Sequence, residues 1–325
     1  MTETSEYDYE LPRELIAQAP AVRRVDARLM LVDRKRQLID HYYIRDLPQL
    51  LQAGDALVLN DTRVIPARLA GYRTRTRGRL QAGETITLQD RQLGDALQLT
   101  VVANLGGGQW AMRPDDSSPS LALLDRVGRV PLPGYIRGGE MVDADEKSYQ
   151  TVFGEKPGAI AAPTAGLHFT ENLLKEIEQR GVQIRRVTLH VGIGTFRPIS
   201  AENLDGHVMH SEWGSVDAET VDWLSDVRQR GNRIVAVGTT VVRTLESAAA
   251  DGVLKAWQGE TNLFIRPPYT IRTIDALLTN FHLPRSTLLV LVRTFGGDQL
   301  IQRAYAEAIH ERYRFYSYGD AMLIV

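Results

Sequence analysis

Six short segments of the chain combine polar, titratable and small residues more densely than core packing requires. These segments span residues 59–68, 162–170, 188–198, 207–213, 237–247 and 278–284. Five of the seven histidines fall within them. Because an imidazole titrates near neutral pH, this grouping indicates acid-base chemistry or ligand binding.

The histidines occupy positions where a chain usually meets a ligand. His190 closes an apolar strand and precedes Gly192 and Gly194, which allow the backbone to come close to a bound molecule. A histidine at a strand end is also ordinary where a backbone group satisfies it. His207 and His210, followed by Glu212, have the residue types of a metal site but no thiolate and no further spaced ligand, so an acid-base or hydrogen-bonding role is favoured.

Two further clusters follow predicted strands. Asp61 and Arg63 come after the apolar run 56–59, where they would form a turn with a salt bridge, bind a cationic substrate, or act as a base. Asn280 and His282 end another apolar strand before a proline, and a purely structural loop seldom needs both, which favours a ligand-facing role.

A third cluster opens a helix after a strand. Gly238, Thr239 and Thr240 would present free N–H groups and the positive end of the helix dipole to an anion. Arg243 and Glu246 lie one turn apart on this helix, where a simple intrahelical ion pair is the ordinary interpretation.

The elements that position these residues can be predicted from periodicity, caps and turn residues. We expect strands at 28–33, 37–44, 56–59, 84–88, 96–102, 109–112, 182–190 and 233–237, and helices at 47–51, 120–127, 170–180 and 217–230. The alternation of strands and helices after residue 159 predicts an α/β fold with a largely parallel sheet. The short alternating segments in the middle predict a small antiparallel, barrel-like β domain inserted into it. We therefore expect a discontinuous α/β catalytic domain of residues 1–67 and 155–325 and an inserted domain of residues 68–154.

Composition narrows the class of protein. The 325 residues include no cysteine, which excludes disulfides and thiolate metal sites and fits a reducing compartment, with the cytoplasm as the default. No apolar run approaches the length of a membrane span, and the acidic start is unlike a signal peptide. The net charge of −2 requires that any polyanion be held by a local patch. The candidate patch is the alternating row Arg73, Arg75, Arg77 and Arg79, which suits a phosphate backbone or an edge strand protected by its charges.

Taken together, the segments resemble the S-adenosylmethionine:tRNA ribosyltransferase-isomerase family of queuosine biosynthesis. The resemblance covers the first 68 residues and nearly all of residues 130–325, including the ending at residues 313–324. It implies a monomeric enzyme that uses S-adenosylmethionine as a ribosyl donor and co-substrate and holds no permanently bound cofactor. The implied acceptor is 7-aminomethyl-7-deazaguanine at the wobble position of a tRNA with a GUN anticodon, converted to epoxyqueuosine with release of adenine and methionine.

This chemistry requires a base, an acid and groups that hold the substrates. The expected acid-base set is Asp61, His168, His190, His210 and Glu212, without individual roles. The residues expected to bind substrate are Arg63, Thr195, Arg197, Thr239, Thr240, Arg243, Glu246, Asn280 and His282, and those expected to bind RNA are the four arginines of the row. No metal ligand is expected.

The chain departs from the family pattern between residues 68 and 81, where the arginine-threonine repeat replaces a longer β segment. The inserted domain is therefore expected to be shorter than in the family. Two alternatives follow: a paralogue with the same donor chemistry on a different acceptor, and a non-catalytic RNA-binding protein.

Overall fold

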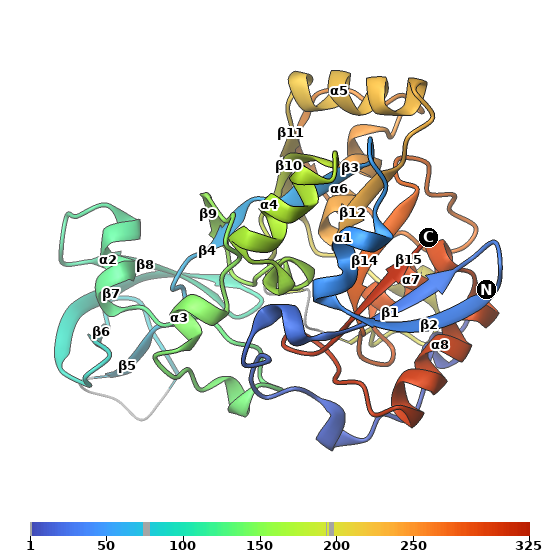
Figure 1. The fold of residues 1–325 in the computed structure, drawn as a ribbon. Coiled ribbons are helices and arrows are strands. Elements are labelled where there is room, and N and C mark those ends of the chain that lie inside the picture. Colours follow the sequence, from blue (N-terminus) through green and yellow to red (C-terminus); the bar gives the residue numbers. More distant parts are fainter. Residues whose placement is uncertain (1, 74–78, 193, 195–197) are drawn as a thin grey trace. The chain divides into compact units, whose positions relative to one another are not determined.

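The computed structural model describes residues 2–73, 79–192, 194 and 198–325, which form two compact units (Figure 1). The larger unit comprises Met1–Val64, Pro133–Glu140 and Ala144–Val325, and the smaller unit comprises Ile65–Leu132 and Met141–Asp143. Most of the stretch from 133 to 154, which the sequence assigned to the inserted domain, packs with the larger unit because residues such as Tyr149 and Phe153 are buried there. The assignment of the units as separate domains stays a prediction.

Among the described residues, a nine-stranded sheet forms the centre of the larger unit, in the order β13-β11-β10-β3-β12-β14-β15-β1-β2. Its strands are β1 (Arg28–Asp33), β2 (Leu38–Tyr43), β3 (Ala56–Asn60), β10 (Gln183–Leu189), β11 (Glu212–Val216), β12 (Ile234–Val237), β13 (Trp257–Thr261), β14 (Ala276–Asn280) and β15 (Ala321–Ile324). The α/β class is confirmed.

The sheet is mixed, which corrects the expectation of a largely parallel one. The four neighbouring strands β10, β3, β12 and β14 run parallel, as the strand-helix alternation predicted. The pairs β10–β11, β11–β13, β14–β15 and β1–β2 are antiparallel. Strands β1 and β2, and likewise β10 and β11, follow one another without an α-helix between them in the described residues, and such neighbours pair antiparallel.

Helices cover both faces of the sheet, and the alternation of side chains along β3 shows how. Val58 packs into a core with α5 (Ala218–Gln229), α6 (Thr239–Ala248), α7 (Thr287–Gly296) and α8 (Asp298–His310). Leu57 and Leu59 pack into a second core with α1 (Leu47–Leu50) and α4 (Glu171–Gln179). Every residue of β3 is buried, which is what a central strand between two helix layers requires.

The predicted helix starts are confirmed. The side chain of Thr170 accepts a hydrogen bond from the N–H of Leu173 at the start of α4, and Asp217 accepts one from Thr220 at the start of α5. Gly181 follows α4 with a φ of 83°, a conformation that favours glycine.

A separate pair of parallel strands lies in the larger unit. It joins β4 (Thr62–Val64) to β9 (Lys156–Ala159), with the short helix α3 (Asp145–Ser148) preceding β9 in the chain. This pair continues from the end of β3 and becomes important for the site.

The smaller unit contains an antiparallel sheet in the order β5-β6-β7-β8 and one helix, α2 (Ser120–Val127). Its strands are β5 (Ala70–Arg73), β6 (Thr85–Gln89), β7 (Asp95–Gly106) and β8 (Gln109–Pro114). Leu88, Leu97, Leu123 and Val127 form its small core. Strands β6, β7 and β8 and the helix were predicted and β5 was not, whereas closure into a barrel stays a prediction.

Within the described ranges, no helix is long and apolar enough to cross a membrane.

Candidate active site

Several of the predicted site residues gather at one edge of the sheet. The four parallel strands β10, β3, β12 and β14 are neighbours, so their carboxyl ends meet there. His190, Asp61 and Thr239 follow the first three strands, and Asn280 ends the fourth. In open α/β sheets this edge is where ligands bind.

A hollow of about 510 Å³ opens at the ends of β12 and β14, and we call it the Thr240 pocket. It is lined by Ala161, Ala162, Pro163, Thr164, Ala165, Val191, Gly238, Thr239, Thr240, Thr279, Asn280, His282, Leu288, Tyr316 and Ser317. Gly238 has a φ of 91° and turns the chain from β12 into α6. The Thr240 hydroxyl is buried and has no hydrogen-bond partner among the described residues, so it is available to a ligand.

Two histidines support the Thr240 pocket as neutral groups. His168 Nε2 accepts a hydrogen bond from the Asn280 amide at 3.2 Å, and the Asn280 oxygen accepts one from Thr164 at 2.9 Å. His282 Nε2 lies 2.9 Å from the Thr279 hydroxyl. Burial lowers the pKa of His168 and of His282 to about 3, with Arg314 and Arg24 adding to the effect at His168. Neither imidazole can therefore serve as a proton donor near neutral pH.

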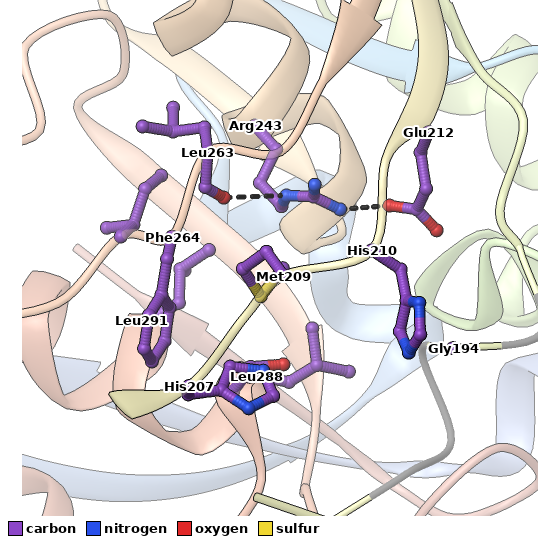
Figure 2. A pocket seen from close by; sticks show the side chains of 12 residues that line it. Gly194, His207, Met209, His210, Glu212, Arg243, Leu263, Phe264, Leu288 and Leu291 are labelled. Carbon is purple, nitrogen blue, oxygen red and sulfur yellow. Dashed lines mark hydrogen bonds and ion pairs between the residues drawn. The ribbon is translucent and has the colours of Figure 1, made fainter. Parts of the chain in front are cut away.

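A second hollow of about 500 Å³ adjoins the first at Leu288, and we call it the His210 pocket (Figure 2). It is lined by Gly194, His207, Met209, His210, Glu212, Arg243, Leu263, Phe264, Ile265, Thr287, Leu288 and Leu291. The His210 side chain is exposed, and its imidazole lies so close to Gly194 that a Cβ added there would overlap the ring.

Arg243 and Glu212 form a buried ion pair in this pocket, as Figure 2 shows. The second Glu212 oxygen accepts a hydrogen bond from the N–H of Gly192 at 2.8 Å. Arg243 Nε donates to the carbonyl of Leu263 at 3.2 Å. Each charge is thus neutralised and hydrogen-bonded, as a buried pair requires.

This geometry corrects the ordinary interpretation of α6, in which Arg243 pairs with Glu246. Glu246 instead accepts hydrogen bonds from Tyr269, Arg272 and Thr273. Arg243 and Glu246 are both buried, and each is hydrogen-bonded by groups from another part of the chain and not by the other.

Asp61 belongs to a third group, which also contains Lys156 and Thr188. The Thr188 hydroxyl donates to Asp61 Oδ1 at 2.7 Å. Lys156 Nζ donates to that hydroxyl at 3.0 Å and lies 3.3 Å from Asp61 Oδ2. Asp61 is 3% exposed and already holds a cation, which favours a role in holding charge over removing a proton.

His190 adjoins this group. Its Nδ1 lies 2.8 Å from the Thr62 hydroxyl, and its ring stacks on Trp213. Partial burial lowers the pKa of His190, the nearby Lys156 lowers it further, and the Asp61 carboxylate opposes both effects. Among the predicted histidines it is half-buried, so it can both meet a ligand and titrate.

The strand β11 separates two subsets of the predicted acid-base residues. Its side chains alternate between faces, so Glu212 and Trp213 point in opposite directions. Glu212 lies with Arg243 and His210 on one side, whereas His190 lies against Trp213 on the other.

Several predicted residues lie elsewhere. Arg63 is exposed on β4 beside the buried Thr62 and Val64. In the smaller unit, Arg73 ends β5 with its Nε 3.8 Å from Glu84, and Arg79 is exposed. Thr195 and Arg197, and the row members Arg75 and Arg77, lie outside the described residues.

Sequence reasoning missed Lys156, Gly158, Thr188 and Trp213. Lys156 and Gly158 lie on β9, whose pairing with β4 was not predicted. Thr188 and Trp213 stood inside the selected segments, yet no local pattern distinguishes them from ordinary strand residues. In the described part of the chain, no three His, Cys, Asp or Glu side chains gather as a metal site would require.

Comparison with known proteins gives matches over the whole chain. Residues 4–324 match the family described as queuosine biosynthesis protein. The S-adenosylmethionine:tRNA ribosyltransferase-isomerase of Xylella fastidiosa strain M23 is 48% identical over 341 aligned positions, covering 100% of this chain and 98% of that protein. The protein of the same name from Rubrobacter xylanophilus is 49% identical, covering 99% and 97%. A crystal structure of S-adenosylmethionine tRNA ribosyltransferase from Thermotoga maritima aligns with a TM-score of 0.61 at 36% identity, covering 98% of this chain and 100% of that one.

Proposed function

The chain belongs to the queuosine biosynthesis protein family, and from this premise we propose that it is an S-adenosylmethionine:tRNA ribosyltransferase-isomerase. It transfers and isomerises the ribosyl moiety of S-adenosylmethionine onto 7-aminomethyl-7-deazaguanine at the tRNA wobble position. The products are epoxyqueuosine-tRNA, adenine and methionine. The observation that carries the proposal is the identity of about half the residues to enzymes of that name along their full length.

The reaction needs a base for the proton beside the sulfonium and an acid for the departing adenine. His190 and His210 are our candidates for these two roles, because both imidazoles can reach a bound substrate. His190 is half-buried, and His210 is exposed in the His210 pocket. Asp61 and Glu212 each face a cation, and we assign them the task of tuning and orienting the reacting groups. His168, with its low pKa, acts through its hydrogen bond to Asn280.

The Thr240 pocket suits the amino-acid end of the donor. The first N–H groups of α6 and the free Thr240 hydroxyl favour a carboxylate there. Thr239, Asn280 and His282 line the same pocket. Arg63, Thr195, Arg197, Arg243 and Glu246 remain predicted binding residues, and the contacts of the last two favour a supporting role.

The acceptor is a tRNA with a GUN anticodon, whose wobble base must leave its stack to reach a buried site. We assign the phosphate contacts to the arginine row of the smaller unit, a barrel-like module that is shorter than in the family. The alignment to the Xylella enzyme spans 341 positions for the 325 residues of this chain, so that enzyme has residues which this chain lacks. The enzyme acts as a cytoplasmic monomer with S-adenosylmethionine as co-substrate and no resident cofactor.

Mass spectrometry of nucleosides tests this function. The protein is incubated with S-adenosylmethionine and a tRNA that carries 7-aminomethyl-7-deazaguanine. Epoxyqueuosine with one adenine released per modified base is expected. Adenine release with unmodified tRNA would indicate a paralogue with another acceptor, and binding without any release would indicate a non-catalytic RNA-binding protein.

A further inference from the structure

The His190 imidazole is held on three sides by residues from three different strands. Its Nδ1 lies 2.8 Å from the hydroxyl of Thr62 on β4. Its ring stacks on Trp213 of β11, with centroids 5.2 Å apart and planes 19° from parallel. Gly158 of β9 lies against the ring atoms Cε1, Nε2 and Cδ2.

The three contacts restrict different motions of the ring. The stack on Trp213 restricts the plane of the imidazole, and the hydrogen bond from His190 N–H to the Trp213 carbonyl, at 2.8 Å, holds the two backbones together. The Thr62 hydroxyl holds Nδ1, so the rotation of the ring about its Cβ–Cγ bond is restricted and Nε2 is directed away from Thr62.

Gly158 closes the third side. A Cβ at this position would lie 2.8 Å from the imidazole, closer than carbon atoms approach in real structures. Any side chain at residue 158 would therefore displace the ring that Trp213 and Thr62 hold.

The residues around this ring are themselves held in place. β4 and β9 pair in parallel from Thr62–Lys156 onward. Lys156 on β9 contacts both Asp61 and Thr188, which joins the pair to β3 and β10. Thr62, Gly158 and Trp213, which we call the clamp, are therefore held by the strands that also carry the predicted acid-base residues.

We propose that Thr62, Gly158 and Trp213 are positioning residues that hold the His190 imidazole in one orientation for proton transfer. The proposal rests on the function given above, in which His190 is a reacting group. Holding a proton-transfer group within a fraction of an ångström is worth a large factor in rate, because a misplacement of about 1 Å costs about 100-fold.

The chain offers a matched control for Gly158. Gly259, on β13, has the same φ of 155° as Gly158, so an alanine at either position is held at the same φ, which L residues rarely adopt. An added Cβ at Gly259 would lie 3.8 Å from the Trp257 ring, which is ordinary contact. Comparing Gly158→Ala with Gly259→Ala therefore isolates the effect on His190.

The first readout is adenine release, with kcat and KM measured separately. Gly158→Ala is expected to lower kcat about 100-fold relative to Gly259→Ala, with KM for S-adenosylmethionine changed less than about threefold. Thr62→Val is expected to lower kcat and to shift its pH profile, and Thr62→Ser, which keeps the hydroxyl, is expected to restore both. A kcat for Gly158→Ala equal to that of Gly259→Ala would overturn the proposal.

The second readout is NMR of the His190 ring, which does not depend on turnover. Gly158→Ala and Thr62→Val are expected to shift the ring signals and their titration, whereas Gly259→Ala leaves them unchanged. Unchanged ring signals in both variants would overturn the clamp even in an active enzyme. If the wild-type protein releases no adenine, the proposed function fails, while the ring signals still decide whether the clamp exists.

Discussion

The charges around His190 act on it in opposite directions. Lys156 lowers the pKa of the imidazole, beyond the larger effect of burial, and Asp61 raises it. The two charged groups lie 3.3 Å apart, so a variant that removes one of them keeps the other near His190. The pH dependence of the reaction should therefore respond to each of them separately.

We predict that Lys156→Met and Asp61→Asn shift the acid limb of the pH profile of kcat/KM in opposite directions. A protonated imidazole cannot accept a proton, so activity falls as the pH drops through the pKa of His190. Removing Lys156 raises this pKa and moves the acid limb to higher pH, whereas removing Asp61 moves it to lower pH.

Adenine release measured between about pH 5 and pH 8 checks this prediction. Lys255→Met serves as the control, since Lys255 pairs with Asp251 on the surface. Identical acid limbs in all three variants would show that His190 does not limit the reaction at low pH.

Helix α6 and strand β11 are joined by the buried pair of Arg243 and Glu212, so the pair matters for stability as well as for the pocket. We predict that Glu212→Gln lowers the free energy of unfolding by about 3 kcal/mol, because it leaves the buried Arg243 charge without a counter-charge. The double variant with Arg243→Met should lose less than the sum of the two single variants.

Urea denaturation followed by circular dichroism gives these free energies. Glu260→Gln on the adjacent strand is the control, since Glu260 is exposed and contacts Ser211. Wild-type stability in Glu212→Gln together with lost turnover would instead identify Glu212 as a reacting group.

At the scale of the whole molecule, the neutral histidines under the Thr240 pocket make the fold sensitive to acid. His168 and His282 have pKa values of about 3 in the folded protein, against about 6.5 in an unfolded chain. The unfolded state therefore binds more protons below about pH 6.5, and stability falls as the pH falls from there toward 3.

We predict that the free energy of unfolding drops by up to about 1.4 kcal/mol per pH unit for each of these two histidines in that range. Urea denaturation at a series of pH values below 7 measures the slope. His282→Gln should flatten it, and His310→Gln, at an exposed histidine, should not. A slope that is the same in both variants would contradict the assignment.

The sequence by itself determined the α/β class, many of the strands and helices, and the expectation that polar residues meet at the carboxyl edge of the parallel strands. These follow from local rules: apolar runs of four or five residues form buried strands, as at 56–60, and Thr170 and Asp217 start helices through their own side chains. The polar residues after such strands meet because parallel neighbours share a carboxyl edge.

Only the tertiary structure decided which of these side chains face one another. Arg243 pairs with Glu212 and not with Glu246, which is nearer in the sequence. The free energy of a buried ion pair depends on partners that come from distant parts of the chain. Lys156 and Gly158 lie at the site because β9 pairs with β4, and no local pattern specifies that contact between Thr62 and Lys156, which are far apart in the sequence. The neutral state of His168 depends on burial and on long-range contacts, so it is a property of the folded chain alone.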